Sequence, residues 1–376
     1  MPHTYRVAIV GLAHMHINHV AEVFAAHPQV EWLACADTIP LRPEVREAPY
    51  TRAWNRKNVM ARWGIPRAYD DYREMLERER PDIAIVTAEN AQHPSVVEAC
   101  AAAGVRLCCV EKPMAHTLSG ALAMARAAEA AGCTLAINWP SAWSPALRKV
   151  QQLVAEGAIG RVLEVKYRAG HTGPLGPGAS HAGVSEDAAL LSGPERGATW
   201  WHQSAAGGGA MLDFCSYGCM MSRWIIGEGA TAALGMRANL DSPYGDAEDN
   251  AVLLVRYPGA MALCEASFTT WDHGVSPGPI VYGTTGTLVV ELRDGQEIVR
   301  LERGGGRTTL HEPEPLPPGR DEIAAEVIHH LETGEPLLPL VAAGFNLEVM
   351  GILDAGVRSA ASRRLEPVES ATWCIG

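Results

Sequence analysis

A lysine, an aspartate and a tyrosine have the spacing expected of an acid–base site. Lys112 follows the apolar run 105–110, which is typical of a buried strand, and ligands bind at the carboxyl ends of strands in open α/β sheets. Asp213 and Tyr217 are four residues apart, on one face of a predicted helix that follows the glycines 207–209. An ammonium beside a phenol lowers the phenol's pKa from about 10. These side chains therefore predict proton transfer coupled to hydride transfer at an alcohol carbon. The bare glycine backbone would let a substrate or a nicotinamide ring pack closely.

The first strand and the loop after it predict a dinucleotide-binding unit. Residues 6–10 are rich in β-formers, and a helical pattern follows Gly11. The loop retains only the first glycine of the G-x-G-x-x-G fingerprint, and its residues are Gly11, Leu12, Ala13, His14, Met15 and His16. Free N–H groups at the start of the helix would attract a diphosphate. Asp37 ends the strand 30–36, so its carboxylate would accept the ribose hydroxyls of NAD; Arg42 keeps NADP as an alternative.

Several histidines could bind a ligand. His14 and His16 form an H-x-H pair of the kind that binds metal in barrel-type hydrolases, but such a site needs further ligands, which the sequence does not place. A phosphate-loop or structural role is favoured for both, and no metal site is predicted. His171 and His181 lie in a stretch rich in Gly, Pro and Ser, residues 170–209, and we expect them to donate hydrogen bonds to substrate hydroxyls.

Alternation of strands and helices over the first 140 residues predicts a doubly wound parallel sheet. Closely spaced β-like runs separated by turn signals then predict an antiparallel sheet, and they cover residues 232–238, 251–257, 261–270, 279–283, 286–292 and 297–302. Two helices, 321–332 and 343–361, close the chain. We expect an α/β protein with a dinucleotide-binding domain at 1–140 and a second α/β domain at 141–376, whose last helices are free to pack back on the first domain.

Composition excludes several classes of partner. The 376 residues include 31 Lys and Arg against 43 Asp and Glu, a net charge of −12, which argues against nucleic acid and anionic membranes. No apolar run approaches the roughly 20 residues that span a bilayer, and the start of the chain lacks the build of a signal peptide. The nine cysteines form no C-x-x-C pair, as expected of reduced thiols in the cytoplasm.

Three motifs in the right order resemble one known family. They are Glu111-Lys112-Pro113, the segment Ala88-Glu89-Asn90-Ala91-Gln92-His93 and the Gly-Gly-Gly-x-x-x-Asp-x-x-x-Tyr run at 207–217. With a late turn at 283–286, they resemble the glucose–fructose oxidoreductase / inositol dehydrogenase / MocA (Gfo/Idh/MocA) family over nearly the whole chain, from Tyr5 to about Val368.

The resemblance implies a Rossmann domain joined to an α/β domain with an open, mostly antiparallel sheet, through which members form homodimers or homotetramers. It implies that Lys112 and Asp213 are catalytic and that Tyr217 replaces the family's usual histidine, as in the glucose–fructose oxidoreductase branch. Residues expected at the cofactor by this match are Ala88, Asn90, His93, Glu111, Lys112, Asn138 and Trp201. A cis peptide bond is expected between Lys112 and Pro113.

The leading hypothesis is an NAD-dependent oxidoreductase acting on a sugar, cyclic polyol or glycoside, with Lys112, His171, His181, Asp213 and Tyr217 at the substrate. A second hypothesis keeps the fold but recycles the cofactor, because some relatives oxidise a sugar transiently while they cleave or eliminate at a neighbouring carbon. A third is a non-catalytic sensor of sugars or dinucleotides, which the eroded glycine loop favours and the intact Lys112, Asp213 and Tyr217 disfavour.

Overall fold

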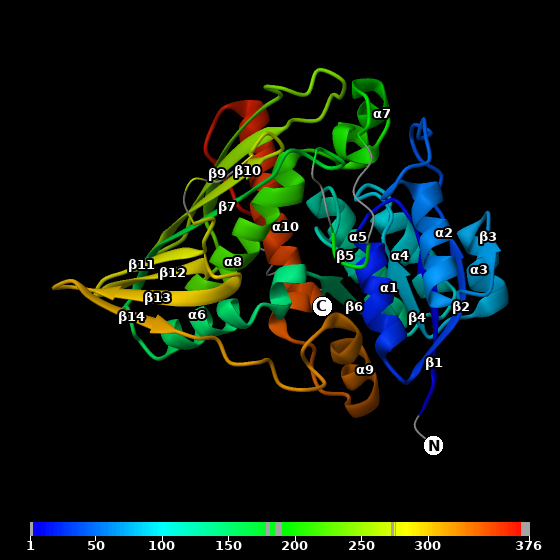
Figure 1. The fold of residues 1–376 in the computed structure, drawn as a ribbon, viewed down its shortest axis with the longest axis horizontal. Coiled ribbons are helices and arrows are strands. Elements are labelled where there is room, and N and C mark those ends of the chain that lie inside the picture. The colour runs from blue at the N-terminus through cyan, green and yellow to red at the C-terminus, as the bar shows by residue number, and fades with distance from the viewer. Residues whose placement is uncertain (1–2, 178–180, 185–189, 272–273, 275, 370–376) are drawn as a thin grey trace.

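The computed structural model describes residues 3–177, 181–184, 190–271, 274 and 276–369 (Figure 1). Its first sheet has six parallel strands in the order β3-β2-β1-β4-β5-β6. The strands are β1 (Tyr5–Val10), β2 (Val30–Ala36), β3 (Ala68–Tyr69), β4 (Ile83–Val86), β5 (Leu107–Glu111) and β6 (Thr134–Asn138). The connecting helices are α1 (Ile17–Ala26), α2 (Arg52–Trp63), α3 (Tyr72–Glu79), α4 (His93–Ala102) and α5 (Leu118–Ala131). The predicted doubly wound parallel sheet is confirmed.

The second sheet has nine strands in the order β14-β13-β12-β11-β7-β10-β9-β8-β15. All neighbouring pairs are antiparallel except β7 with β10, so the predicted mostly antiparallel sheet is also confirmed. The strands are β7 (Val162–Gly170), β8 (Ala232–Ala238), β9 (Asn250–Arg256), β10 (Met261–Ser267), β11 (Ile280–Gly283), β12 (Gly286–Arg293), β13 (Gln296–Arg303), β14 (Arg307–His311) and β15 (Glu366–Pro367). The sequence did not predict β14, a polar edge strand, or the two-residue strands β3 and β15.

The remaining α-helices are α6 (Pro145–Ala155), α7 (Gly193–Gly197), α8 (Ser216–Ile226), α9 (Ile323–Thr333) and α10 (Ala343–Ser362). Of these, α6 and α8 pack on the second sheet and α9 packs against the first domain (Figure 1). Helix α10 packs on β8 and also reaches α5 and β6, and α9 packs on α1. Trp139, just after β6, donates its indole N–H to Asn346 of α10 over 2.7 Å. The closing helices therefore pack back on the first domain. Among the described residues, none of the helices is long and apolar enough to cross a membrane.

The carboxyl ends of β1, β4, β5 and β6 meet at one edge of the parallel sheet. Strands β4 and β5 are buried along their whole length, because helices cover both faces of such a sheet. Gly11 and Lys112 follow the ends of β1 and β5, and Asn138 is the last residue of β6. The Lys112–Pro113 bond is cis, as expected. The fold thus places the predicted site residues of the first domain along one edge of the parallel sheet.

Gly11 is required where β1 turns into the loop, and its replacement by alanine tests that requirement. Its φ is +87°, and an added Cβ would lie 2.4 Å from the backbone nitrogen of Ala88. Gly11→Ala should lower the free energy of unfolding by about 3 kcal/mol, from left-handed strain and overpacking. Gly132→Ala is the matched control, because its φ is +67° but nothing lies within 4 Å; it should cost only about 1 kcal/mol. Urea unfolding of both variants measures the difference, and equal losses would contradict the close contact.

Candidate active site at the carboxyl edge of the parallel sheet

Lys112 from the first domain meets Asp213 and Tyr217 from the second. The Lys112 ammonium donates to the Asp213 carboxylate over 2.5 Å and to the Asp213 carbonyl over 3.0 Å. It also lies 4.6 Å from the centre of the Tyr217 ring. Lys112 is only 1% exposed and Asp213 8%, so the ion pair is buried. The three side chains that the sequence singled out are therefore in mutual reach.

The helix that carries Asp213 and Tyr217 is not the continuous α-helix that the sequence predicts over 210–226. A π-helical turn spans Met211–Cys215, and α8 begins at Ser216. The Asp213 carbonyl accepts hydrogen bonds from Lys112 and from the Ser216 hydroxyl, at 3.0 and 2.8 Å. Such turns recur at functional sites because they free backbone groups from the helical ladder. The π-helical turn therefore supplies a backbone carbonyl that accepts a hydrogen bond from Lys112. The side chains of Asp213 and Tyr217 still face that lysine.

The expected electrostatic effect on Tyr217 is wrong in sign. Burial raises the pKa of the Tyr217 phenol well above 10, and the negative charges of Glu111 and Asp213 raise it further. The ammonium of Lys112 is paired with Asp213, so it does not bring the pKa of Tyr217 down as the sequence led us to expect. The phenol is therefore a proton donor at neutral pH rather than a ready acceptor.

The loop after β1 is covered by the second domain. Trp200 donates its indole N–H to the Ala13 carbonyl over 3.1 Å, and its ring packs on Trp201 with centroids 4.8 Å apart. The loop residues buried beneath them, each at most 3% exposed, are Leu12, Ala13, His14 and Met15. Within the loop the Leu12 N–H donates to Asp37 over 2.8 Å and the His14 N–H donates to the Thr87 carbonyl over 3.0 Å, so part of the expected diphosphate-binding backbone is already hydrogen-bonded.

Asp37 fits a ribose diol, but it also holds the loop and an arginine. Its Oδ1 accepts the Leu12 N–H over 2.8 Å and an Arg52 N–H over 2.7 Å. The side chain of Asp37 remains 24% exposed, so the carboxylate still faces solvent. Arg52 is buried and also pairs with Glu89, whereas Arg42 is exposed. Sequence reasoning missed Arg52, which looked like an ordinary residue at a helix start.

A second polar group joins the same edge. The His16 ring nitrogen Nδ1 lies 3.0 Å from one oxygen of Glu111, and the Asn138 amide donates to the other oxygen over 3.0 Å. Burial alone would raise the pKa of Glu111, but His16 and Lys112 hold that pKa below its usual value. The rings of His14 and His16 have centroids 4.2 Å apart. The structure thus brings together His14, His16, Glu111 and Asn138.

The other residues predicted to line the cofactor are buried, Asn90 at the contact between domains and His93 and Ala88 within the first domain. The Asn90 amide donates to the Gly207 carbonyl over 2.8 Å, and both ring nitrogens of His93 lie 3.2 Å from backbone carbonyls. Ala88 is fully buried beneath Gly11. The side chains of Ala88, Asn90 and His93 therefore support the strand ends. Asn90 Oδ1 has no hydrogen-bond partner among the described residues.

His181 and His171 flank the site from the glycine-rich stretch. The His181 ring lies 5.8 Å from that of His16, and burial with the charge of His16 lowers the pKa of His181 to about 3. His171 packs edge-on against Phe214 with ring centroids 5.0 Å apart, next to Asp213. Both imidazoles are therefore neutral hydrogen-bonding groups near Lys112 and Asp213.

The three glycines have another reason than the predicted one. A Cβ on Gly207 would lie 2.7 Å from that of His116, and one on Gly209 would lie 2.5 Å from a Glu248 oxygen. A Cβ on Gly208 would lie 2.4 Å from two backbone carbonyl oxygens, those of Trp200 and Trp201. Protein atoms fill the space that a Cβ would occupy at each of these three glycines.

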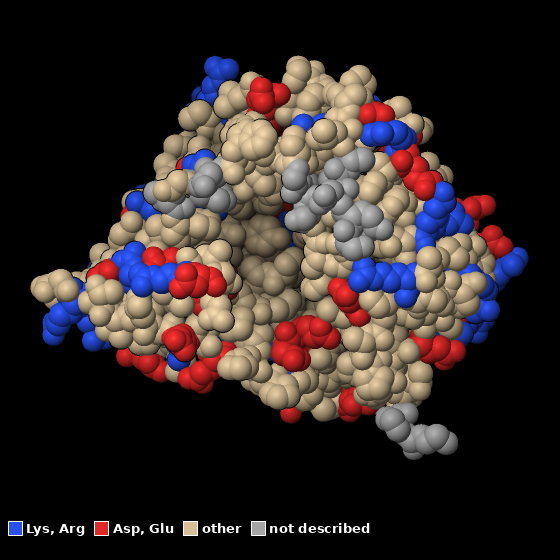
Figure 2. All heavy atoms as spheres, viewed as in Figure 1, with Lys and Arg blue, Asp and Glu red and all other residues tan. Residues whose placement is uncertain are grey.

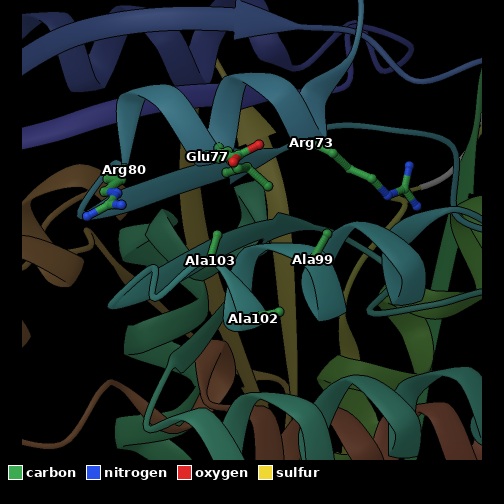
Figure 3. Close-up of a pocket in the computed structure, with 7 residues that line it drawn as sticks. Arg73, Glu77, Arg80, Ala99, Ala102 and Ala103 are labelled. Atoms are coloured by element: carbon green, nitrogen blue, oxygen red, sulfur yellow. The ribbon is translucent and has the colours of Figure 1, made fainter.

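The face between the two lobes is hollowed (Figure 2). A cavity of about 210 Å³ in this region is lined by His16, His19, Val23, Asn138, Pro140, Trp143, His181, Ala182, Glu322 and Ile323. A larger cavity, of about 560 Å³, lies between α3 and α4, with Arg73, Glu77 and Arg80 along one side (Figure 3). That groove contains none of the predicted site residues, whereas the cavity between the lobes is lined by His16, Asn138 and His181.

Comparisons with known proteins agree with this arrangement. The pattern described as "Oxidoreductase family, NAD-binding Rossmann fold" matches residues 5–139, and that of the "GFO/IDH/MocA C-terminal domain" matches 147–289. Levoglucosan dehydrogenase of Pseudarthrobacter phenanthrenivorans is 26% identical over 338 residues, 82% of this chain and 80% of that protein. Myo-inositol 2-dehydrogenase of Thermotoga maritima is 24% identical over 289 residues, 74% of this chain and 78% of that protein.

Solved structures share the fold over nearly the whole chain. An aldose-aldose oxidoreductase from Caulobacter crescentus, complexed with glycerol, has a TM-score of 0.73 at 22% identity and covers 97% of this chain and 99% of its own. A levoglucosan dehydrogenase in complex with NADH and levoglucosan has a TM-score of 0.72 at 21% identity and covers 98% of this chain and 100% of its own. These likenesses establish the two-sheet α/β architecture.

Proposed function

Because the chain belongs to the Gfo/Idh/MocA oxidoreductase family, we propose that it is an NAD-dependent dehydrogenase of sugars, cyclic polyols or glycosides. It would move a hydride between NAD and a hydroxyl-bearing carbon. Relatives that oxidise levoglucosan and myo-inositol support this substrate class. A relative named for NADP, D-xylose 1-dehydrogenase of Haloarcula marismortui, keeps NADP as the alternative cofactor.

The observation that carries the proposal is the meeting of Lys112 with Asp213 and Tyr217 across two domains. A buried ammonium next to a neutral phenol can polarise an alcohol or carbonyl oxygen and exchange a proton with it. Either group alone would be an ordinary residue. Their convergence at the edge where α/β sheets bind ligands supports an active site.

Bound NAD supplies the acceptor for the hydride, and the chain's own residues handle the oxygen and its proton. The Lys112 ammonium would stabilise negative charge on the substrate oxygen, and Asp213 would hold that ammonium in place. Tyr217 would donate its phenolic proton to the oxygen during carbonyl reduction and take one back, as phenolate, during alcohol oxidation. His171 and His181 would bind neighbouring hydroxyls of the substrate.

NAD would be held by Asp37, Glu111, Asn138 and the loop 11–16. Asp37→Asn tests the contact with the ribose. A hydrogen bond to a charged group is worth about 1.5–3 kcal/mol, so the Kd for NAD should rise about tenfold or more. Isothermal titration with NAD and NADP measures it. Arg42→Ala is the control and should leave the Kd for NAD unchanged; an unchanged Kd for Asp37→Asn would remove Asp37 from the site.

A cofactor-recycling glycoside-cleaving or eliminating enzyme of the same fold is the second candidate. The packing of Trp200 and Trp201 on the loop favours it, because a dinucleotide bound at a loop held between the two domains would leave slowly. The discriminating experiment follows cofactor absorbance during turnover of a glycoside. Stoichiometric formation of NADH indicates net oxidation, and product formation with constant NADH indicates recycling. Tight NAD binding without turnover on a broad sugar panel would indicate the sensor instead.

We also propose two domains, 1–140 and 141–376, and a homodimer or homotetramer. Strands β8, β9 and β10 carry exposed apolar side chains that a partner subunit would cover, namely Leu234, Met236, Leu254 and Met261. The eight described cysteines are free and buried, which supports the cytoplasm as location. Light scattering at micromolar concentration tests the assembly, and a monomer would contradict it.

A further inference from the structure

Three groups beside the proposed active site take no part in the proton transfer at the substrate, although Glu111 and the loop that carries the other two also line the proposed NAD site. They are the imidazoles of His14 and His16 and the carboxylate of Glu111. One ligand atom of each lies within 4.8 Å of the others, although Glu111 is 95 residues away from His16 in sequence. The sequence presented only an H-x-H pair without further ligands. The strand order β1-β4-β5 places the missing carboxylate next to that pair.

One atom of this group is unsatisfied. His14 is 2% exposed, and its Nε2 has no hydrogen-bond partner among the described residues. A buried polar atom without a partner costs free energy, so it points to an absent ligand. The other ring nitrogen of His14 accepts only a long bond, 3.2 Å, from the His16 N–H. The His14 imidazole is therefore buried beside His16 and Glu111, but its Nε2 atom has no hydrogen-bond partner there among the described residues.

We propose that His14, His16 and Glu111 bind a divalent transition-metal ion. Two imidazoles and one carboxylate are the donor set of catalytic zinc sites that keep one coordination position open. The same set binds Fe²⁺ in oxygenases, whereas Mg²⁺ and Ca²⁺ prefer all-oxygen sites. The separation of 3.0 Å between His16 Nδ1 and the Glu111 oxygen is close to the roughly 3.3 Å between donors in a tetrahedral zinc site.

The surroundings suit such an ion. Asn138 holds the second oxygen of Glu111 over 3.0 Å, and metal-binding carboxylates are commonly oriented by a hydrogen bond of this kind. Lys112 is the nearby cation that would oppose a metal, but its charge is paired with Asp213. With Glu111 as the one anionic ligand, the site would carry one residual positive charge, which an anionic or hydroxyl oxygen can offset.

The open position would face the cavity between the lobes. His16 lines that cavity of about 210 Å³, and so do Asn138 and His181. The ring of His181 lies 5.8 Å from that of His16, within reach of a fourth ligand position or of an oxygen bound to the ion. The site therefore adjoins the region where the substrate hydroxyls are expected.

The inference goes beyond the proposed dehydrogenase and does not depend on it, because metal binding is measured without NAD or sugar. The experiment uses the full chain, untagged and stripped with a chelator. Zn²⁺ is titrated by calorimetry, and Co²⁺ is titrated by visible absorption, which reports nitrogen and oxygen ligands. We expect one equivalent per chain. His16→Ala, His14→Ala and Glu111→Gln should each weaken binding by at least about 10–100-fold, because loss of a ligand costs no less than loss of the hydrogen bond that orients it.

His27→Ala is the matched control. His27 lies at the far end of α1, and its removal should leave the affinity for Zn²⁺ unchanged. Glu111→Gln keeps the shape of the side chain, so it remains informative should a histidine variant fail to fold, which circular dichroism reveals. Absence of stoichiometric binding to the wild type, or unaltered binding by Glu111→Gln, overturns the site. Metal binding without NAD binding would support this site while defeating the dehydrogenase.

Discussion

Replacing Lys112 by methionine should abolish the proposed activity and destabilise the protein. The methionine removes the only ammonium that contacts Asp213 in the described residues. Loss of charge stabilisation at the substrate oxygen should lower kcat/KM by about 10³-fold or more. Asp213 would remain as an uncompensated buried charge, which costs about 3–5 kcal/mol of unfolding free energy. Steady-state kinetics on the best sugar from a substrate panel and urea unfolding measure the two effects.

A double variant separates catalysis from folding. In Lys112→Met with Asp213→Leu the buried ion pair is replaced by apolar groups of similar size, which is often neutral for stability. Stability should therefore return while activity stays lost. Lys166→Met is the matched control, because Lys166 pairs with Glu164 on a half-exposed surface and such pairs contribute little. A stable Lys112→Met variant that keeps a tenth of wild-type turnover would remove Lys112 from the mechanism.

The carboxyl-edge chemistry was predictable because it follows from local patterns. The apolar run that ends at Lys112 shows a strand end, and the interval between Asp213 and Tyr217 shows one helix face. Strand ends in a parallel sheet converge, so Lys112 could be assigned to a ligand site without coordinates. The family resemblance placed Lys112 and Asp213 in one active site, and the structure brings them together as an ion pair.

Contacts between distant segments could not be predicted in the same way. Nothing in the sequence around Arg52 shows that it pairs with Asp37 and Glu89, nor that Trp200 covers Ala13. Burial of the arginine depends on strand order and on how the second domain packs. Such long-range contacts leave no local periodicity in a single sequence. The packing of Trp200 on the loop was therefore visible only in the structure.

The sign of the effect on Tyr217 failed for a related reason. The presence of an ammonium nearby was predicted correctly, but the pKa of a phenol depends on all charges around it and on burial. Asp213 neutralises Lys112, and Glu111 and Asp213 both face the ring with negative charge. The balance raises the pKa of Tyr217.

Tyr217→Phe should lower kcat by about 10²–10⁴-fold, and the wild type should show different pH dependence in the two directions. Reduction needs the protonated phenol, which is present at every pH below its raised pKa, so its rate should be flat through the neutral range. Oxidation needs the phenolate, whose fraction grows about tenfold per pH unit below that pKa, so its rate should keep rising through pH 10. Stopped-flow measurement of both directions from pH 6 to about 10.5 tests this.

The matched control for this prediction is Tyr167→Phe. Its ring lies 6.4 Å from that of Tyr217, so the variant disturbs the same aromatic cluster while leaving the proposed proton donor in place. It should keep the rise of the oxidation rate with pH, whereas Tyr217→Phe should lose it. A plateau of the wild-type oxidation rate near neutral pH would mean that Lys112 does lower the phenol's pKa. That result would contradict the pairing of Asp213 with the Lys112 ammonium.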